Sequence, residues 1–353
     1  MIKILHSADW HLDSPLLLQN SEQSQLLRRA LFRVPEQVAA ICKAEKCDMM
    51  LLSGDLFDGA YAADTLQMLR SVLESVEVPV FIAPGNHDYI GADSPWLSVS
   101  WPDNVHIFTH PVMESVDLPQ LDCCVYGAGF ISMDCPGLLA DFTPNHTERY
   151  SVGVLHGDPT QISSPYNPIT TEQVKQSELD YLALGHIHKG DSFRAGKTLC
   201  AWPGCPIGRG YDETGEKGVL IVTIDETTQT QFIPLDTPRF HDLEIAANTD
   251  LSTILPPVGN NDFYRITFTG ASEPLDLASI QETYSRFPHL TLRDRTTAPV
   301  DIWGSAGDDT LEGMYFKLLR DGMQDTDEEI QRKIRLAAQI SRQILDGQEV
   351  VLP

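Results

Sequence analysis

Short apolar runs alternate with helical patterns over the first part of the chain. The runs that suit buried strands are residues 2–8, 49–53, 78–83, 123–127, 151–155 and 181–184. Apolar residues at three- and four-residue spacing predict helices over residues 25–46 and 63–76. This alternation predicts an α/β core in which the strands are buried and helices cover the faces of the sheet.

The pattern changes near residue 198. Strands are predicted over residues 198–202, 218–224 and 230–235, between turns rich in Gly and Pro. A second unit begins near Phe240, with strands at 263–268 and 290–294 around a helix at 275–287, and then helices at 311–322 and 328–345. We therefore expect three parts, namely residues 1–238, 239–304 and 305–353.

The last predicted helix has one apolar face over charged neighbours. Its apolar stripe consists of Ile330, Ile334, Ala337, Ile340 and Ile344. Such a stripe is typical of a helix that packs on its own domain. It is equally typical of a helix that binds a partner protein, so this pattern leaves both interpretations open.

Side chains of metal-binding type follow five of the predicted strands. In chain order they are Asp9 and His11, then Asp55, then Asn86, His87 and Asp88, then His156, and last His186 and His188. Ligands of α/β proteins gather at the carboxyl ends of the strands. Asp, Asn and His without a thiolate suit Mn²⁺, Fe²⁺ or Zn²⁺ and argue against a structural zinc site.

Each position has a simpler explanation when it is taken alone. Asp9 and Asp55 suit turns or helix caps, and residues 86–88 suit a turn. His186 and His188 are two residues apart, so in an extended segment their side chains point to the same side, toward one shared ion or toward one ion each. Five strand ends of this kind in one chain argue strongly against a purely structural explanation.

Composition indicates an ordinary globular protein. The chain has 353 residues, of which 42% are hydrophobic and 21% charged. No run approaches the roughly 20 apolar residues that span a bilayer, and the N-terminus enters a strand without signal-peptide features. Seven cysteines without a C-x-x-C pair indicate reduced thiols. We therefore expect a cytoplasmic protein that does not enter a membrane.

The charge balance restricts how the chain binds anions. It has 50 acidic residues against 25 basic ones, a formal net charge of −25. A protein that binds a phosphate backbone by itself usually has a basic face. An anionic substrate must therefore be bound locally, or with the help of a partner.

The polar residues occur in an order that resembles a known family. The order D-x-H, G-D-x-x-D, G-N-H-D, H and G-H-x-H is similar to the signature of the calcineurin-like metallophosphoesterases, over about residues 1–220. The stretches 6–15 and 202–218 resemble those of SbcD and YhaO-type DNA repair exonucleases, relatives of the eukaryotic Mre nuclease, although Cys205 replaces an expected small polar residue. The resemblance implies a four-layer α/β/β/α sandwich with a small C-terminal α/β cap and terminal helices.

The resemblance also implies a site with two divalent metal ions, Mn²⁺ first, with Fe²⁺ or Zn²⁺ as alternatives. The ligands of the first ion would be Asp9, His11, Asp55 and His188. The ligands of the second would be Asp55, Asn86, His156 and His186, with Asp55 bridging. Two such ions activate a water and stabilise both oxygens of an in-line displacement at phosphorus.

The remaining residues of the motifs receive roles by the same resemblance. His87 would lie over the site and stabilise charge or protonate the leaving oxygen, with Asp88 orienting its ring. Arg209 would contact substrate phosphate, but an arginine in a Gly-rich surface loop explains it equally well. Asp58 occupies a position where some repair nucleases have His, and we assign it no catalytic role.

The implied activity is a Mn²⁺-dependent DNA nuclease (3′–5′ exonuclease and endonuclease) that acts in double-strand break repair. Its partners would be DNA, a second copy of the chain, and a coiled-coil ATPase of SbcC or YhaN type that docks on the C-terminal helices. Two alternatives remain. One is a small-molecule phosphodiesterase, such as one that cleaves cyclic nucleotides, which the acidic balance favours. The other is a scaffold without catalysis, against which the complete ligand set argues.

Overall fold

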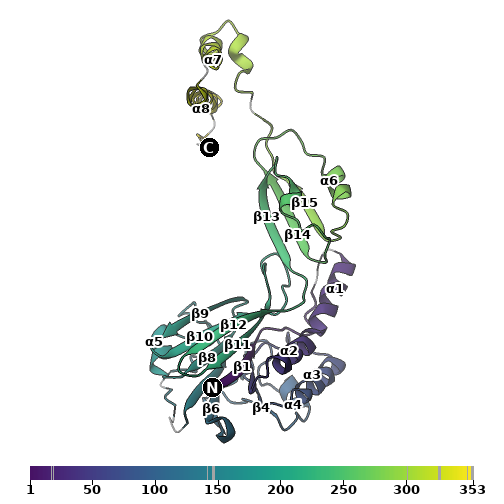
Figure 1. Ribbon diagram of the computed structural model, residues 1–353, viewed down its shortest axis with the longest axis vertical. Coiled ribbons are helices and arrows are strands. Elements are labelled where there is room, and N and C mark those ends of the chain that lie inside the picture. Colours follow the sequence, from purple (N-terminus) through teal and green to yellow (C-terminus); the bar gives the residue numbers. More distant parts are fainter. Residues whose placement is uncertain are drawn as a thin grey trace. The chain divides into compact units, whose positions relative to one another are not determined.

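Two six-stranded sheets form the framework of the chain in the computed structural model (Figure 1). The structure describes residues 1–353 apart from 17, 19, 141, 145–147, 300, 325–326, 348 and 351–353. The first sheet has the order β12 (Thr228–Pro234), β11 (Gly218–Ile224), β1 (Ile2–Ser7), β2 (Met49–Leu52), β3 (Val80–Ile82) and β4 (Val105–Ile107). The second has the order β5 (Glu114–Leu118), β6 (Cys123–Gly127), β7 (Tyr150–His156), β8 (Tyr181–Gly185), β10 (Thr198–Gly204) and β9 (Lys189–Ala195).

The strands that carry the predicted ligands are parallel within each sheet. Strands β1 to β3 are parallel neighbours, with Ser7 of β1 paired to Leu52 of β2. Strands β7 and β8 are parallel neighbours in the second sheet, with His156 paired to Gly185. The carboxyl ends of neighbouring strands therefore meet at one edge of each sheet, as the sequence predicts.

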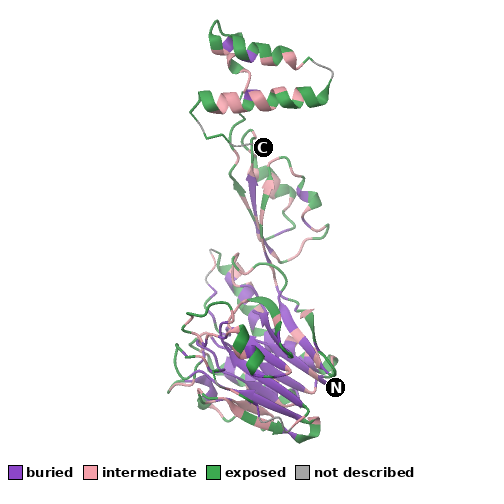
Figure 2. Cartoon of the chain, turned by 90° about the vertical axis from the view of Figure 1, so that its left-hand side faces the viewer, coloured by how far each residue is buried: buried purple, intermediate pink, exposed green. Residues whose placement is uncertain are grey.

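Alternate residues of the central strands face two different cores. Ile4 of β1 packs in a cluster that also contains Val152 of β7, whereas Leu5 packs with helix residues such as Leu69. Side chains of a strand alternate between the two faces of the sheet, which explains this division. In Figure 2 these strands are drawn as buried along most of their length. The α/β fold with mixed sheets is confirmed.

The helices of this part differ from the prediction at one point. They are α1 (Ser21–Phe32), α2 (Val34–Ala44), α3 (Ala63–Ser75), α4 (Pro95–Ser98) and α5 (Thr171–Gln176). The single helix predicted over residues 25–46 is wrong, because α1 and α2 meet at Arg33. Pro35 lies in the first turn of α2, where its missing N–H does no harm; inside a continuous helix its ring would clash with the carbonyl of Leu31.

A three-stranded sheet and further helices follow. The sheet has the order β13 (Phe240–Ala246), β14 (Phe263–Thr269) and β15 (Leu290–Asp294). Helix α6 (Leu277–Thr283) is shorter than predicted, whereas α7 (Leu311–Gly322) and α8 (Glu328–Leu345) have the predicted bounds. Short 3₁₀ turns lie at Pro119–Leu121, Leu251–Thr253 and Gly304–Gly307. Among the described residues, no helix combines the length and apolar character that crossing a membrane requires.

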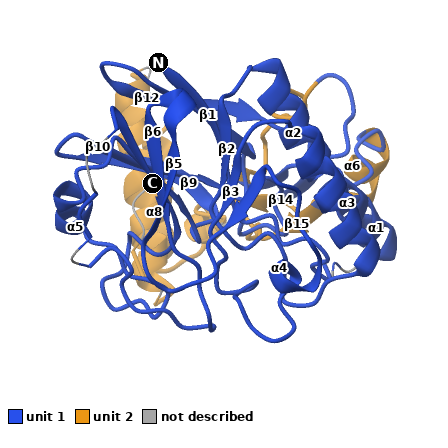
Figure 3. Cartoon of the chain, turned by 90° about the horizontal axis from the view of Figure 1, so that it is seen from below, with its two compact units in different colours: residues 1–243, 257–266, 284–291 blue, residues 244–256, 267–283, 292–353 orange. Residues whose placement is uncertain are grey.

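The chain divides into two compact units (Figure 3). The first consists of residues 1–243, 257–266 and 284–291, and the second of residues 244–256, 267–283 and 292–353. Every predicted site residue belongs to the first unit. Within the second unit, Phe316 of α7 and Ala338 of α8 pack together in a small buried cluster. The predicted division at residues 238 and 304 stays a prediction.

A buried histidine joins the two large sheets. His6 of β1 is fully buried, and its ring nitrogens contact the Tyr181 hydroxyl at 2.7 Å, the Ser53 hydroxyl at 2.9 Å and the Leu184 carbonyl oxygen at 3.1 Å. Burial lowers the pKa of His6 to about 3, although the Leu184 carbonyl works against that shift. Between about pH 6.5 and pH 3, His6 is therefore neutral in the folded chain while the unfolded chain binds the proton.

We predict that the His6 contribution to stability falls as the pH falls. In the unfolded chain His6 titrates near its usual pKa of about 6.5, so below that pH only the unfolded state binds the proton. The free energy of unfolding should therefore drop between about pH 7 and pH 5. The variant His6→Gln should be less stable at pH 7 but lose less on acidification, as measured by urea unfolding at both pH values. Parallel losses in both proteins would contradict this role of His6.

Candidate metal centre

The structure brings the seven predicted metal ligands together at the ends of five strands. Asp9 and His11 follow β1, Asp55 follows β2, Asn86 follows β3, His156 ends β7, and His186 and His188 follow β8. The site therefore takes residues from both large sheets. Asp9, His11, Asp55, Asn86 and His156 are buried, whereas His186 and His188 are partly exposed. The ends of the two sheets thus form a cluster of oxygen and nitrogen donors.

The backbone at these strand ends is strained. Asp9 (φ 55°), His11 (φ 50°), Asp55 (φ 50°) and His186 (φ 98°) all have the positive φ that side chains rarely adopt. Backbone bonds between the two turns hold this geometry, because the Asp9 N–H donates to the Gly54 carbonyl at 3.0 Å and the His11 N–H to the Asp55 carbonyl at 2.9 Å. Strain of this kind persists where the surroundings fix it, and it clusters at functional sites.

One glycine makes room for the cluster. A Cβ on Gly85, just before Asn86, would lie 2.3 Å from a carboxylate oxygen of Asp55 and 2.8 Å from the ring of His156. No side chain fits there without displacing both residues. The G-N-H-D order therefore needs its glycine for close approach of the backbone to the site.

The first group of donors consists of Asp9, His11 and His188. The Nδ1 atoms of His11 and His188 donate to carboxylates, of Asp58 at 3.1 Å and of Glu213 at 2.6 Å. In a neutral imidazole the other nitrogen is then a bare acceptor. The two Nε2 atoms lie 3.1 Å apart, so their lone pairs face each other. A shared cation between them would turn this repulsion into attraction, and this group therefore fits a metal ion.

The second group surrounds the Nε2 atom of His156. The Nδ1 atom of this ring donates to the Ser53 carbonyl at 2.8 Å, which turns Nε2 toward Oδ1 of Asn86 at 3.0 Å and Oδ2 of Asp55 at 3.3 Å. Nδ1 of His186 lies 3.2 Å from the same Asn86 oxygen. Two oxygens and a second nitrogen around one imidazole nitrogen suit a borderline-hard cation. The assignment of these residues to a second ion remains our prediction.

Charge at the site is concentrated on buried carboxylates. Burial disfavours the charged form of Asp55, but His156, His11 and His87 outweigh burial and hold the pKa of this carboxyl below its usual range. Burial likewise disfavours protonated His156, yet Asp55 and Asp9 raise its pKa to about 9. Burial, reinforced by His156, lowers the pKa of His186 to about 4. The cluster thus attracts positive charge to the space between Asp55 and His156, where a divalent ion would replace the proton.

The contacts of Asp58 and Asp88 differ from the expectation that Asp88 orients His87 and that Asp58 has no catalytic role. Asp58 contacts Nδ1 of His87 at 2.9 Å as well as His11, and these two hydrogen bonds hold the pKa of Asp58 below its usual range. Asp88 instead accepts backbone N–H groups of the two neighbouring turns, from Gly85 at 2.7 Å and Leu56 at 2.8 Å among them. Burial raises the pKa of Asp88 to about 7. Asp58 therefore orients His87, and Asp88 holds the loops.

His87 lies at the open side of the cluster. Its side chain is 40% exposed, and its backbone N–H donates to a carboxylate oxygen of Asp55 at 2.9 Å. The hydrogen bond to Asp58 raises the pKa of His87 above its usual value. Because Nδ1 is held by Asp58, Nε2 is the nitrogen that remains for a substrate.

Glu213 is a site residue that the sequence did not reveal. Its carboxylate accepts from His188 and also from the backbone N–H of Arg209 at 2.8 Å and the Arg209 guanidinium at 3.1 Å. Burial opposes its charge, but His188 and Arg209 hold the pKa of Glu213 below its usual range. Arg209 is thus paired with Glu213, which in turn contacts the proposed metal ligand His188. The only signal was that Glu213 lies in the stretch 202–218, which carries the resemblance to repair exonucleases.

Cys205 lies next to His188 and Glu213. Its thiol lies 3.5 Å from the His188 carbonyl oxygen and 3.7 Å from Oε2 of Glu213. Burial, together with the charge of Glu213, raises the pKa of Cys205 to about 12. A thiol with such a pKa stays protonated, so Cys205 packs against His188 and Glu213 as a neutral group.

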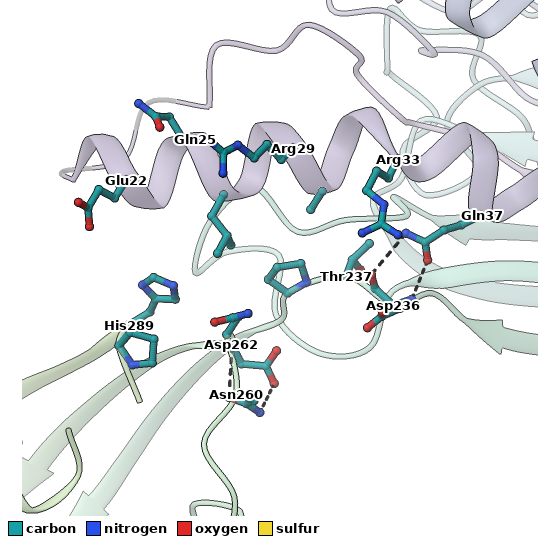
Figure 4. Close-up of a pocket in the computed structure, with 15 residues that line it drawn as sticks. Glu22, Gln25, Arg29, Arg33, Gln37, Asp236, Thr237, Asn260, Asp262 and His289 are labelled. Carbon is teal, nitrogen blue, oxygen red and sulfur yellow. Dashed lines mark hydrogen bonds between the residues drawn. The ribbon is translucent and has the colours of Figure 1, made fainter. Parts of the chain in front are cut away.

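A separate cavity of about 810 Å³ lies between helices α1 and α2 and the segments near Asp236, Asp262 and His289 (Figure 4). The exposed arginines Arg29 and Arg33 project into it, and Gln37 and Asp236 exchange hydrogen bonds across one end. The cavity contains none of the predicted site residues.

Comparison with known proteins agrees with the geometry. A family model described as calcineurin-like phosphoesterase matches residues 2–190. The chain is 30% identical over 236 residues to a protein of Bacillus subtilis (strain 168) named "Uncharacterized metallophosphoesterase YhaO", a match that covers 63% of this chain and 57% of that protein. It is 21% identical over 318 residues to the SbcD component of the nuclease SbcCD from Staphylococcus epidermidis, covering 78% and 81%.

Solved structures match over a similar part of the chain. A dimetal phosphatase from Danio rerio is 13% identical, with a TM-score of 0.44, and the match covers 65% of this chain and 95% of the phosphatase. The chain thus spans little more than half of the YhaO protein but most of the staphylococcal SbcD component.

We predict that Glu213 supports metal binding through His188. Outer hydrogen-bond partners of ligating histidines typically contribute roughly 10- to 100-fold in metal affinity. Glu213→Ala should therefore weaken Mn²⁺ binding by that factor, and Glu213→Gln, which keeps an acceptor oxygen, by less, as measured by titration calorimetry. Glu216→Ala is the matched control, since Glu216 pairs with Arg239 at 2.9 Å. Equal Mn²⁺ affinity of wild type and a folded Glu213→Ala variant would refute the role.

Proposed function

The chain belongs to the calcineurin-like phosphoesterase family, and on this premise we propose that it is a metal-dependent phosphodiesterase that cleaves DNA. The observation that carries the phosphodiesterase proposal is the convergence of seven side chains with nitrogen or oxygen donors at the ends of five strands, with His87 at the open side of this cluster. We further infer that the two large sheets and the helices on their outer faces form the four layers of an α/β/β/α sandwich.

DNA is the substrate that the sequence similarity favours. The match to the SbcD component covers 78% of the chain, which is more than the phosphoesterase model at residues 2–190 can account for. The similarity therefore includes the segment after the phosphoesterase domain, and an enzyme for a small cyclic nucleotide does not need that segment. The proposed activity is a Mn²⁺-dependent 3′–5′ exonuclease and endonuclease acting at double-strand breaks.

The residues of the site would have separate roles in metal binding and in proton donation. Asp9, His11, Asp55 and His188 would hold one divalent ion, and Asp55, Asn86, His156 and His186 the other. Bound there, the ions would supply an activated water and neutralise phosphate charge. His87, whose pKa Asp58 raises, would donate its Nε2–H to the phosphate or to the leaving oxygen.

The C-terminal helices are the proposed site for a coiled-coil ATPase of SbcC or YhaN type. In the stripe predicted on α8, Ile330 and Ile344 are 40% and 60% exposed and the other three residues are partly buried. The neighbouring Ala338 packs on Phe316 of α7. The apolar residues Leu311, Met314 and Leu318 lie on one face of α7 and are 87%, 59% and 74% exposed. This face of α7 therefore joins α8 as the proposed contact surface. Such a partner would also supply basic surface for DNA to a chain with net charge −25.

We expect substitutions of His87 and Asp55 to have different effects on metal binding and turnover. His87→Ala should keep its metal but lose about 10²- to 10⁴-fold in turnover, the usual contribution of a general acid. Asp55→Ala should lose bound metal as well, because it removes the bridging carboxylate. Metal analysis of the purified variants, alongside rates on a phosphodiester substrate, separates the two effects. Equal metal content in both variants would disprove this division.

The substrate class is tested with the purified chain and Mn²⁺. Linear duplex DNA, single-stranded DNA and cyclic nucleotides are each assayed with and without the candidate ATPase. We expect cleavage of DNA, with duplex cleavage increased by the ATPase. Cleavage confined to cyclic nucleotides would remove the nuclease proposal and leave the phosphodiesterase.

A further inference from the structure

A second cavity adjoins the proposed metal centre within the first unit. It has a volume of about 400 Å³, and its lining includes His188, Lys189, Trp202, Lys217 and Phe232. These residues come from β9 and β10 of the second sheet, from β12 of the first sheet, and from the segment that precedes β11. The volume lies in the range of small-molecule pockets, roughly 300–1,000 Å³. His188 places the cavity directly beside a proposed metal ligand.

Lys217 is the residue that marks this cavity as a binding site. It is only 7% exposed, and among the residues that the structure describes its ammonium group has no hydrogen bond or ion pair. Its backbone is held in place, because the Lys217 carbonyl accepts from the Leu235 N–H at 2.9 Å. The side-chain stem of Lys217 is buried, whereas its ammonium nitrogen keeps contact with solvent. An anion in the cavity would provide the missing partner.

The other charges around the cavity leave this lysine uncompensated. Lys189 adds a second cation at the exposed side, also without an ion pair among the described residues. Two carboxylates line the cavity as well, but Glu216 is paired with Arg239 at 2.9 Å, and Asp191 is exposed and accepts the Ser192 N–H at 2.8 Å. In a chain with net charge −25, two unpaired lysines in one small cavity are a local exception.

The walls suit a flat aromatic group. Trp202 is buried and fixed in place, because its indole N–H donates to the Lys189 carbonyl at 2.9 Å. Phe232, from the edge strand β12, is 39% exposed. Nucleobases stack on aromatic side chains without regard to their sequence, and each such contact is worth about 1–3 kcal/mol. A phosphate group on the lysines and a base against Phe232 together describe a nucleotide.

We propose that this cavity binds the nucleotide next to the scissile phosphodiester, with its phosphate at Lys217 and Lys189 and its base against Phe232. The proposal rests on the phosphodiesterase function of the neighbouring centre, which it deepens by assigning the residues that bind the nucleotide. It also answers how an acidic chain holds an anionic substrate without a broad basic face, because the positive charge is concentrated in one cavity.

The test is a calorimetric titration of the full Mn²⁺-loaded chain with thymidine 5′-monophosphate, and with inorganic phosphate as the reference anion. Lys217→Met should weaken binding of the nucleotide by roughly 10- to 100-fold, as expected for the loss of a hydrogen bond to a charged group. Phe232→Ala should weaken the nucleotide by roughly 5- to 100-fold and leave inorganic phosphate unchanged. Lys197→Met is the matched control, since Lys197 lies in the turn between β9 and β10 and pairs with Asp180 at 3.2 Å.

Nucleotide affinities that match wild type in both variants would overturn the cavity proposal, because the metal ions alone would then bind the phosphate. If Lys217→Met does not fold, the nucleotide affinity of Phe232→Ala tests the proposal by itself, since a partly exposed side chain tolerates truncation. Hydrolysis of bis(p-nitrophenyl) phosphate by the wild-type chain is measured in parallel. Its absence would disprove the phosphodiesterase proposal, whereas nucleotide binding reports on the cavity separately.

Discussion

Two carboxylates, Asp9 and Asp55, lie buried at the ends of adjacent parallel strands, and the rest of the site depends on this one constraint. They are 1% and 2% exposed, and their loops are joined by backbone hydrogen bonds that keep both in the left-handed region. Like charges buried side by side are stable only with cations close by. The surrounding histidines and the Asn86 oxygen provide the other donors that a metal ion needs, and no lysine or arginine among the described residues takes that place.

The direction of the ring nitrogens follows from groups one step further out. The Ser53 carbonyl, Asp58 and Glu213 each hold the Nδ1 atom of one histidine, namely His156, His11 and His188. Each ring then presents Nε2 to the centre of the cluster. Asp58 does this for His11 and also holds His87, so one carboxylate connects the proposed ligands to the proposed general acid. Asp58, to which the sequence assigns no catalytic role, therefore has three hydrogen-bond partners, namely His11, His87 and Ser14.

The central strands and the candidate ligands were predictable from the sequence, because both follow from burial. Strands inside the sheets are apolar on both faces, and polar residues directly after them are conspicuous. The strands that the sequence did not reveal, β4, β5, β9 and β13, all lie at the edge of a sheet. The edge strand β9, with the sequence KGDSFRA, is exposed along most of its length on both faces, so its sequence resembles that of a loop. The roles of Asp58 and Glu213 were equally hidden, since they depend on how loops fold toward each other rather than on spacing.

The central claim is that the two neighbouring histidines of the motif G-H-x-H serve two different ions. Anomalous scattering from crystals of the Mn²⁺-loaded chain tests it most directly. We expect two manganese peaks roughly 3.5–4 Å apart, one beside Asp9, His11 and His188 and the other beside Asn86, His156 and His186. A single peak that takes both His186 and His188 as ligands would contradict it.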